Sequence, residues 1–293
     1  MPSKQYIWFN GAFVPSDQLI FSVENRGYLY GDGLFETIHA FGTSARHIDL
    51  HHKRLVKSMR LLDMDVPTSL SPEFLENEIS RLLNKNRIFG SARVRLSVTR
   101  RSGGLYAPTG IGVDITVQTT PLEANFYQIN QKGLVIDIFT DLRKPTNFLS
   151  GIKSSNALLY ILAGISAKKA EVDECILIND QNRLSESTSS NLFLIKGDSI
   201  LTPPLNEGCL NGIIRQVIIK IAPELGYKVI EDRPLEPELL LSADEVFLTN
   251  AISGIRWVVA FKNIRYFSKV GRSLCTALNR YTFPDQFKEG LIG

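Results

Sequence analysis

Two kinds of apolar periodicity alternate along this chain, and they restrict the fold more than any other feature of the sequence. Apolar and polar residues alternate in "ARVRLSVTR" (92–100) and "GVDITVQTT" (112–120), which is the period of a half-buried β-strand. Apolar residues recur at helical spacing in 49–63 and again in 72–87. Strands and helices are mixed without a strict βαβ order, so the sequence predicts an α+β protein.

The remaining pattern predicts two domains. "QYIWFNGAFVP" (5–15) indicates a hairpin at an Asn-Gly turn, and strands are expected at 134–140, 174–179 and 245–250. Helices are expected from Lys153 to about Lys169 and over 211–226, where a glycine lies near each end. The polar, irregular stretch 121–133 is interpreted as a connection between a domain of residues 1–120 and a domain of residues 134–293 that carries Lys153.

Composition excludes several classes of partner. The net charge is only +3, and no basic stripe with interleaved aromatic residues is present, so we expect no nucleic-acid or membrane surface. The three cysteines are widely spaced and form no CxxC pair, which argues against a disulfide framework or a zinc site. The N-terminus lacks the apolar core of a signal peptide. A cytoplasmic protein without a bound metal is expected.

Lys153 heads an apolar run in "SGIKSSNALLY" (150–160), an unusual position for a residue that is normally solvated. It is either an ordinary lysine at the start of a helix or a lysine kept for chemistry. A helix N-terminus and apolar neighbours would both lower the pKa of its amine. A neutral amine is nucleophilic and forms a Schiff base with a carbonyl group. The P-loop pattern is excluded because Ile152 separates Gly151 from the lysine.

Glu186 lies in "LSESTSSNLF" (184–193), between a predicted turn and a predicted strand and among hydroxyl side chains. One interpretation is a turn or capping acid. The other is a carboxylate that is buried against a protonated ring nitrogen, because burial of an acid is tolerated when it pairs with a protonated base.

Three places could contact an anionic group such as phosphate. "LNGIIRQ" (210–216) puts Asn-Gly directly before a helix, whose first N–H groups form an anion site. "FLTNAISG" (247–254) offers a corner between strand and turn with Thr249 and Asn250. Arg54 lies in the predicted helix 49–63 and has the fork of donors that suits a phosphate. Each of these features, taken alone, is more often structural.

Taken together and in order, these segments resemble the class-IV aminotransferase family, the fold-type-IV pyridoxal-phosphate enzymes. The resemblance covers nearly the whole chain and is carried by "RGYLYGDGLFET" (26–37), "HIDLHHKRL" (47–55), "GIKSSN" (151–156), "SESTSSNLF" (185–193), "NGIIRQ" (211–216) and "VFLTNAISG" (246–254). It implies a two-domain fold similar to that of D-amino-acid aminotransferase, with a small N-terminal α/β domain and a larger pseudo-barrel domain. It also implies pyridoxal 5'-phosphate as cofactor and a homodimer with the active site near the dimer interface.

The resemblance assigns cofactor contacts by position. Lys153 matches the Schiff-base lysine, which also serves as general base toward a small-molecule amine substrate. Glu186 matches the acid that faces the pyridine nitrogen, and Arg54 matches the phosphate arginine. The remaining cofactor contacts implied by the matching segments are Ile213, Ile214, Asn191 and Asn250.

Within the family, the motifs are most similar to those of aminodeoxychorismate lyase, an enzyme of folate biosynthesis. Ile214 stands where many aminotransferases have threonine, and Asn250-Ala251 matches a pair typical of the lyases. Thr37 falls where the lyases have a threonine that is thought to assist proton transfer. An amino-acid transaminase of the branched-chain or D-amino-acid type is the alternative, and a cofactor-free binding protein on the same fold is a third hypothesis.

The substrate side departs from the family pattern. In "TRRSGGLYAP" (99–108), Leu105 occupies the place of an arginine that would meet a substrate carboxylate in the lyases. Arg93, Arg95, Arg100 or Arg101 could replace it, and strand alternation puts Arg93 and Arg95 on one face. Phe35 stands where the D-amino-acid enzymes have tyrosine. Which bond breaks is therefore left open between the lyase and the transaminase.

Overall fold

The chain divides into two compact units in the computed structural model, which describes residues 5–287. The first unit takes in the chain up to Asn125 together with Ile152–Asn156, and the second takes in Phe126–Gly151 and the chain from Ala157 onward. The expected limits, 1–120 and 134–293 with a connection at 121–133, assign Lys153 to the second domain. The structure instead groups the short segment around Lys153 with the first unit.

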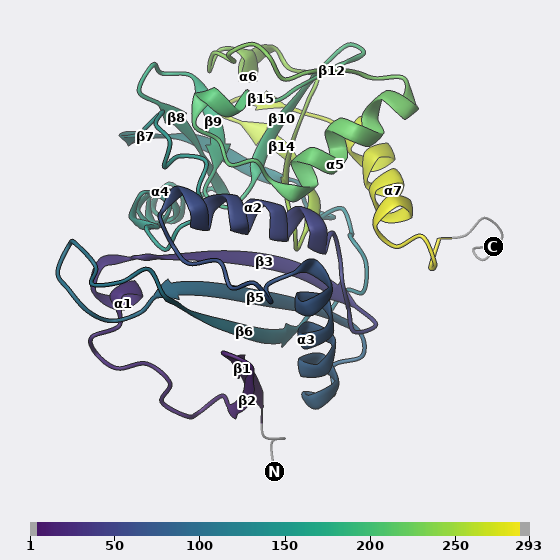
Figure 1. The fold of residues 1–293 in the computed structure, drawn as a ribbon. Helices are drawn as coiled ribbons and strands as arrows, with labels where there is room; N and C mark the ends of the chain where they lie inside the picture. The colour runs from purple at the N-terminus through teal and green to yellow at the C-terminus, as the bar shows by residue number, and fades with distance from the viewer. Residues whose placement is uncertain (1–4, 288–293) are drawn as a thin grey trace. The chain divides into compact units, whose positions relative to one another are not determined.

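The first unit is an antiparallel sheet with two long helices. Its strands are β1 (Tyr6–Phe9), β2 (Ala12–Pro15), β3 (Gly33–Phe41), β4 (Ser44–Ala45), β5 (Ser91–Arg100) and β6 (Val113–Pro121), and its helices are α1 (Arg26–Tyr30), α2 (Ile48–Leu61) and α3 (Pro72–Lys85). The strand order is β2-β1-β6-β5-β3-β4 (Figure 1). The hairpin predicted at Asn10-Gly11 is present, and both turn residues have positive φ, as the tight turn requires.

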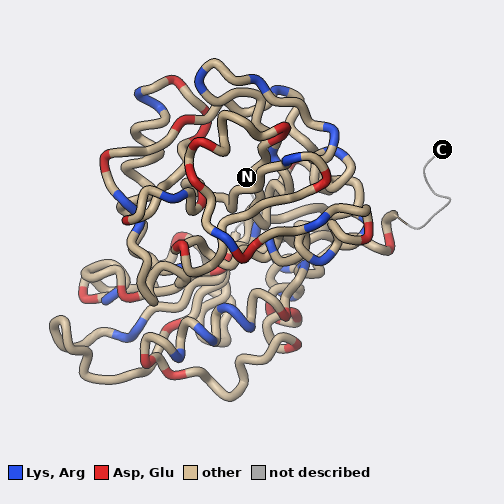
Figure 2. Tube along the Cα trace, turned by 90° about the horizontal axis from the view of Figure 1, so that it is seen from above, with Lys and Arg blue, Asp and Glu red and all other residues tan. Residues whose placement is uncertain are grey.

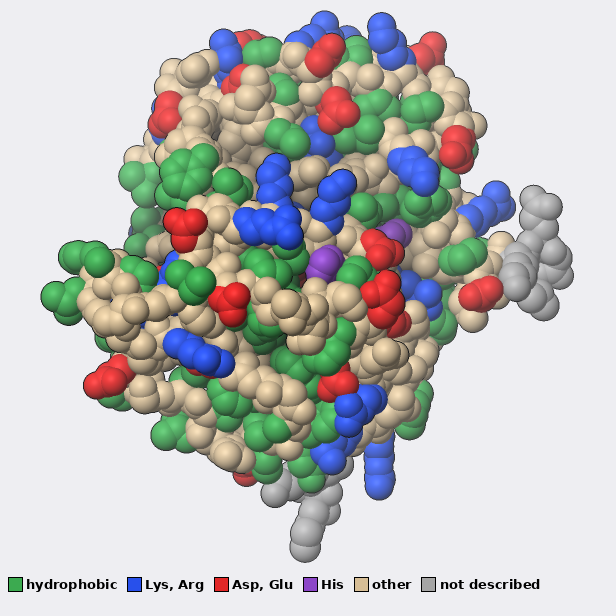
Figure 3. Space-filling model, in the orientation of Figure 1, with side chains coloured by type: hydrophobic (Ala, Val, Ile, Leu, Met, Phe, Trp, Pro, Cys, Tyr) green, Lys and Arg blue, Asp and Glu red, His purple; other side chains and the backbone are tan. Residues whose placement is uncertain are grey.

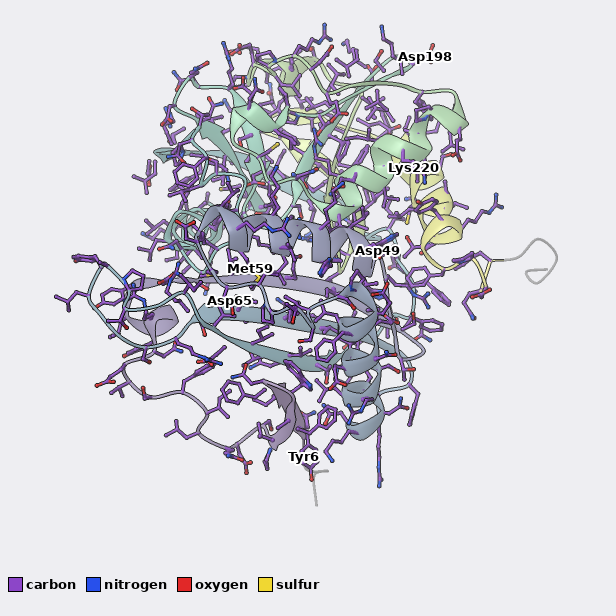
Figure 4. All side chains as sticks on the ribbon, in the orientation of Figure 1. Tyr6, Asp49, Met59, Asp65, Asp198 and Lys220 are labelled. Atoms are coloured by element: carbon purple, nitrogen blue, oxygen red, sulfur yellow. The ribbon has the colours of Figure 1, made fainter. Side chains whose placement is uncertain are left out.

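The core of the first unit lies between this sheet and its helices. Alternate residues of β3 and β5, such as Ile38 and Val94, are fully buried, as the alternation predicts. Met59, labelled in Figure 4, points from α2 toward the sheet and is also fully buried. Both predicted amphipathic helices therefore form where expected and cover apolar strand positions.

The second unit is built on a nine-stranded sheet. Its strands are β7 (Leu134–Lys144), β8 (Glu174–Asn179), β9 (Leu184–Ser187), β10 (Asn191–Lys196), β11 (Ser199–Leu201), β12 (Lys228–Ile230), β13 (Glu245–Asn250), β14 (Gly254–Phe261) and β15 (Ile264–Arg265). Strands β10, β13, β14, β7, β8 and β9 pair in that order, and β9 pairs back with β10. This closed ring matches the expected pseudo-barrel, and closure leaves its strands without a free edge.

Up to residue 287, four helices and two short 3-10 turns accompany the sheet of the second unit. They are α4 (Leu158–Lys169), η1 (Leu205–Glu207), α5 (Ile213–Ile221), η2 (Ala222–Leu225), α6 (Leu239–Ser242) and α7 (Val270–Thr282). The helix expected over 211–226 is α5 followed by η2, because Pro223 lacks the N–H that would continue the α-helical ladder. Within residues 5–287, no helix is both long and apolar enough to cross a bilayer.

The helix expected to start at Lys153 starts instead at Leu158. The preceding residues are extended and pair with the beginning of β3: the N–H of Phe35 donates to the carbonyl of Lys153 at 3.0 Å, and the N–H of Ser155 donates to the carbonyl of Gly33 at 2.9 Å. The prediction of a helix start at Lys153 is therefore wrong. Lys153 is therefore not the N-terminal residue of a helix, which removes that argument for a lowered pKa of its amine.

Charges of both signs are spread over the chain. Figure 2 shows Lys and Arg positions interspersed with Asp and Glu positions along the trace. On the face drawn in Figure 3, charged side chains of both signs likewise lie among apolar ones. The distribution agrees with the small net charge of +3.

Candidate active site

Lys153 is held beside the start of β3 by the extended segment that carries it. Ile152, only 8% exposed, belongs to the apolar core of the first unit and anchors the segment. The Nζ atom of Lys153 lies 4.3 Å from the centroid of the Phe35 ring. Since the face of an aromatic ring attracts a cation, Phe35 helps to fix where this ammonium group lies.

The residues expected to meet the substrate line one face of β3 and β5. Thr37 lies directly opposite Arg95. On the same face, Phe35 lies two residues before Thr37 and Arg93 lies two residues before Arg95, so they flank this pair on opposite sides. The Cζ atom of Arg95 lies 4.0 Å from the centroid of the Phe35 ring, so this one ring contacts both Lys153 and Arg95. Burial and the charge of Arg93 lower the pKa of Arg95 from its ordinary value. The structure thus brings Lys153 and Arg95 to one aromatic ring, with Thr37 and Arg93 further along the same sheet face.

Arg54 forks around a buried carboxylate of the first unit. Its Nε donates to Oε1 of Glu36 at 2.8 Å and its Nη2 donates to Oε2 at 2.5 Å. The Nδ1 atom of His51 lies 2.7 Å from the same Oε2. Although burial opposes ionisation, Arg54 and His51 together hold the pKa of Glu36 at about 2. His52 contacts the carbonyl of Leu70 instead, so the two adjacent histidines point to different partners.

Arg100 does not lie free to meet a substrate, which corrects its place among the expected carboxylate ligands. It is 6% exposed, and its Nε donates to Oδ2 of Asp32 at 2.9 Å. Its Nη1 and Nη2 donate to the carbonyls of Asp63 and Leu62. Strand alternation turns Arg100 away from Arg93 and Arg95, and Asp32 then neutralises it.

The loop after β5 is fastened by a second buried arginine. Arg26 shares the Asp32 carboxylate and donates to the backbone carbonyls of Gly103, Gly104 and Leu105. The side chain of Leu105 is nevertheless 76% exposed. The loop is therefore held by its backbone and presents Leu105 outward.

Glu186 is buried in the second unit and is bound on both oxygens. Its Oε1 accepts hydrogen bonds from Nζ of Lys144 and from the hydroxyl of Tyr160, the latter at 2.8 Å. Its Oε2 accepts the N–H of Leu210 at 2.8 Å. The neighbouring carboxylate raises the pKa of Lys144 above its ordinary value, although burial alone would lower it. Because a carboxylate oxygen has two acceptor positions, Oε2 retains one.

The turn before α5 is fixed through both backbone polar groups of one residue, Leu210. While the N–H of Leu210 binds Glu186, its carbonyl accepts the side-chain amide of Asn191 at 2.7 Å. A Cβ atom on Gly212 would lie 1.9 Å from Oδ1 of Asn191, so the turn requires glycine here. The first helical bond runs from Gln216 to Gly212, which leaves the N–H groups of Ile213 and Ile214 at the open end of α5.

The corner after β13 lies next to this turn in the sheet. Thr249 is directly opposite Asn191 on β10, and its buried hydroxyl has no hydrogen-bond partner within the described residues. Asn250 follows, donates to the hydroxyl of Ser190 at 3.0 Å and accepts the N–H groups of Ile252 and Ser253. Asn250 therefore shapes the corner with its own side chain.

The expected site residues fall into two groups. Lys153, Phe35, Thr37, Arg54, Arg93 and Arg95 lie in the first unit, and Glu186, Asn191, Ile213, Ile214 and Asn250 lie in the second.

Sequence reasoning missed Glu36, Lys144 and Tyr160. The sequence could have indicated Glu36, since it is an acid at an inward position of an alternating strand. Lys144 and Tyr160 gave none, because their partner Glu186 is distant in sequence.

Comparisons with known proteins show which family model, sequences and solved structures this chain matches. The model of the family described as amino-transferase class IV matches residues 33–261. A putative branched-chain-amino-acid aminotransferase of Methanocaldococcus jannaschii is 34% identical over 255 residues, 85% of each chain. An aminodeoxychorismate lyase of Bacillus subtilis is 27% identical over 270 residues, 91% of this chain and 90% of that protein. The solved branched-chain amino acid aminotransferase of Escherichia coli has a TM-score of 0.87 and 26% identity, with 98% of both chains covered.

Proposed function

The chain belongs to the class IV aminotransferase family, whose enzymes depend on pyridoxal phosphate, and from this premise we propose that it is an aminodeoxychorismate lyase. It would convert 4-amino-4-deoxychorismate to 4-aminobenzoate and pyruvate, a reaction of folate biosynthesis. The observation that carries this proposal is the sheet face on which Thr37 opposes Arg95 while Phe35 contacts Lys153.

The second unit fits the phosphate of the cofactor. The open N–H groups of Ile213 and Ile214 suit an anion, and so does the partial positive charge of the α5 N-terminus. The buried hydroxyl of Thr249 offers a further donor, opposite Asn191. Arg54 is assigned to the phosphate on resemblance alone, because Glu36 takes two of its guanidinium nitrogens in this structure.

Glu186 fits the ring nitrogen of the cofactor through one oxygen. Its Oε1 is occupied by Lys144 and Tyr160, whereas Oε2 keeps one acceptor position beside the N–H of Leu210. A protonated ring nitrogen is the kind of donor that a buried carboxylate accepts at low cost.

The catalytic roles in the first unit follow from its chemistry. Pyridoxal phosphate, when bound, supplies an electron sink for bonds that break at the carbon bearing the substrate amine. Nζ of Lys153 would hold the cofactor and, when free, would act as the general base that takes the proton from that carbon. We assign the hydroxyl of Thr37 to the proton that the departing enolpyruvate gains as it becomes pyruvate.

Two guanidinium groups suit the two carboxylates of aminodeoxychorismate. Arg95 is held against Phe35, and Arg93 lies on the same face. Arginine binds a carboxylate with two parallel hydrogen bonds, which orients as well as attracts it. Arg93 and Arg95 would thus replace the arginine that Leu105 displaces from the loop.

A transaminase that uses a dicarboxylic 2-oxo acid as amino acceptor is the second candidate. The 34% identity to a putative branched-chain-amino-acid aminotransferase favours it. The same two arginines would bind the two carboxylates of such an acceptor. In that case Lys153 would return the proton to a carbon of the cofactor, and no bond to the substrate side chain would break.

One incubation separates the two reactions. The purified enzyme, loaded with pyridoxal phosphate, is given aminodeoxychorismate without any 2-oxo acid, and 4-aminobenzoate and pyruvate are measured. Equal amounts of both products over many turnovers support the lyase. Amino transfer to a 2-oxo acid, with no 4-aminobenzoate at high enzyme concentration, would leave the transaminase in its place.

We further propose a homodimer in the cytoplasm. Apolar side chains at helical spacing on α4, Leu158, Ile161, Leu162 and Ile165, are exposed in the single chain, which supports an association surface. The three cysteines are buried free thiols, which fits a reducing compartment. The absence of a bound metal stays a prediction.

A further inference from the structure

Lys144 is a buried lysine, and it contacts the carboxylate assigned to the ring nitrogen. It ends β7 and is 3% exposed. Its Nζ donates to Oε1 of Glu186 and to the hydroxyl of Tyr160 at 2.5 Å. Tyr160 lies on α4 and donates to the same Oε1, so two strands and a helix meet at one oxygen atom.

Oε1 of Glu186 accepts from two side-chain donors, whereas Oε2 accepts from one backbone donor. Two donors on Oε1, one of them cationic, withdraw negative charge from the carboxylate. On Oε2 the backbone N–H of Leu210 is a neutral donor. The carboxylate is thereby fixed in rotation and presents Oε2 as the acceptor for a further group.

The other titratable groups around Glu186 do not replace Lys144. Burial and the Glu186 carboxylate raise the pKa of Tyr160, so its hydroxyl keeps its proton. Burial and Glu186 also raise the pKa of the Cys209 thiol to about 12. Arg215, which acts on Cys209, is itself paired with Glu231 at 2.9 Å. Lys144 is therefore the cation that sets the charge balance at this carboxylate.

We propose that Lys144 is a positioning residue that draws charge from Glu186 and so limits how readily the ring nitrogen of the bound cofactor takes up a proton. A bare buried glutamate would pair with one cation and favour a protonated ring. With Lys144 in place, a protonated ring would be the second cation on one carboxylate. The inference rests on the proposed contact between Glu186 and the ring nitrogen.

The test is a titration of the ring nitrogen in the holoenzyme. Pyridoxal phosphate labelled with 15N is loaded into the wild type and into Lys144→Met, and the 15N chemical shift is followed from pH 6 to pH 10. Removal of a nearby cation should raise the pKa of the ring nitrogen by about 2 to 3, for a separation of about 4 to 6 Å and an effective dielectric constant near 20. Lys144→Arg keeps the charge and should titrate like the wild type.

Two further variants keep the result interpretable. Tyr160→Phe removes one neutral donor from Oε1 and should raise the same pKa by less, which decides the question if Lys144→Met does not fold. Lys220→Met is the matched control: Lys220, labelled in Figure 4, contacts the hydroxyl of Tyr281 at 2.9 Å but is exposed on α5. Lys220→Met should leave the 15N titration of the ring nitrogen unchanged.

The outcomes separate this inference from the proposed function. An unchanged 15N titration in Lys144→Met, or in Tyr160→Phe should the first variant not fold, overturns the role of Lys144 even if the wild type binds cofactor and is active. A lower melting temperature with an unchanged titration identifies Lys144 as merely structural. A wild type that binds no pyridoxal phosphate refutes the proposed function itself.

Discussion

Each unit of this chain has, among its candidate site residues and their contacts, a buried glutamate that pairs with a cation, and Glu36 and Glu186 differ in which carboxylate oxygens stay open to a ligand. In the first unit, Oε1 of Glu36 accepts from Arg54, and Oε2 accepts from Arg54 and His51. In the second unit, Oε1 of Glu186 accepts from Lys144 and Tyr160, whereas the described residues give Oε2 a single backbone donor. Both oxygens of Glu36 are thus occupied by side chains of the first unit, whereas Oε2 of Glu186 can still accept a hydrogen bond from a ligand.

The identity of the cation adds to this difference. Arginine stays charged whatever its surroundings, so Arg54 holds Glu36 ionised over the whole useful pH range. Lysine can give up its proton when it loses its partner in a buried place. Arg54 therefore stays charged even without Glu36, whereas Lys144 can lose its proton when its contact with Glu186 is broken.

The largest expected effect is the loss of activity in Glu186→Gln. The amide cannot stabilise a protonated ring nitrogen, so kcat/KM should fall by about 10³, as for other buried electrostatic contacts. Stability should also fall, but by less at pH 9 than at pH 7, because Lys144 can then lose its proton. The double variant Glu186→Gln with Lys144→Met should regain stability without regaining activity. Activity that survives in the single variant contradicts the assignment of Glu186.

Glu36→Gln should act on stability. It leaves Arg54 beside an amide, and breaking a buried ion pair costs about 3–5 kcal/mol of unfolding free energy. That cost should not shrink between pH 7 and pH 9, measured by denaturant unfolding. If it shrinks as for Glu186→Gln, the distinction between the two glutamates is wrong.

The decrease of the unfolding free energy at low pH should also depend on Glu36. Its pKa falls from an ordinary value near 4.5 to about 2 on folding. A depressed pKa stabilises the fold above pH 4.5, and the contribution is lost as the pH falls toward 2. At about 1.4 kcal/mol for each pKa unit, the contribution is about 3 kcal/mol. The difference in unfolding free energy between wild type and Glu36→Gln should narrow over that window.

Gly212→Ala tests the turn that Glu186 and Asn191 hold together. The new Cβ would meet Oδ1 of Asn191 at 1.9 Å, so the amide must move and release the carbonyl of Leu210. We expect the affinity for pyridoxal phosphate to fall about tenfold, the effect of one lost charge-assisted hydrogen bond. Gly110→Ala, in the loop before β6, meets open space and is the matched control, which should bind the cofactor as the wild type does. Equal affinities of both variants would show that the turn does not hold phosphate.

The smallest effect is expected on substrate affinity. Arg95→Gln removes a carboxylate ligand, so KM for a dicarboxylic substrate should rise about tenfold with a smaller change in kcat. Arg101→Gln, which changes an exposed arginine paired with Asp114, should leave KM unchanged. A rise in KM of equal size in both variants would indicate general electrostatic attraction rather than a defined contact.

The sequence predicted the local features of this site better than its long-range contacts. Periodicity located the strand that carries Thr37 and Arg95, because alternation is a local property. The prediction of a helix start at Lys153 is wrong because this segment pairs with the start of β3, and the serine and asparagine residues of 154–156 are themselves weak helix formers. Arg100 was assigned to substrate because its partner Asp32 lies far away in sequence. Lys144 was missed for the same reason, since its contact with Glu186 exists only in the folded chain.

The central claim is that Lys153, and not the buried Lys144, is the lysine that holds the cofactor. Reduction of the loaded enzyme with borohydride fixes pyridoxal phosphate on the lysine that binds it, and peptide mass spectrometry then locates the label. We predict the label on the peptide that contains Lys153 and its loss in Lys153→Ala. A label on Lys144, or on any lysine in the Lys153→Ala variant, would contradict the claim.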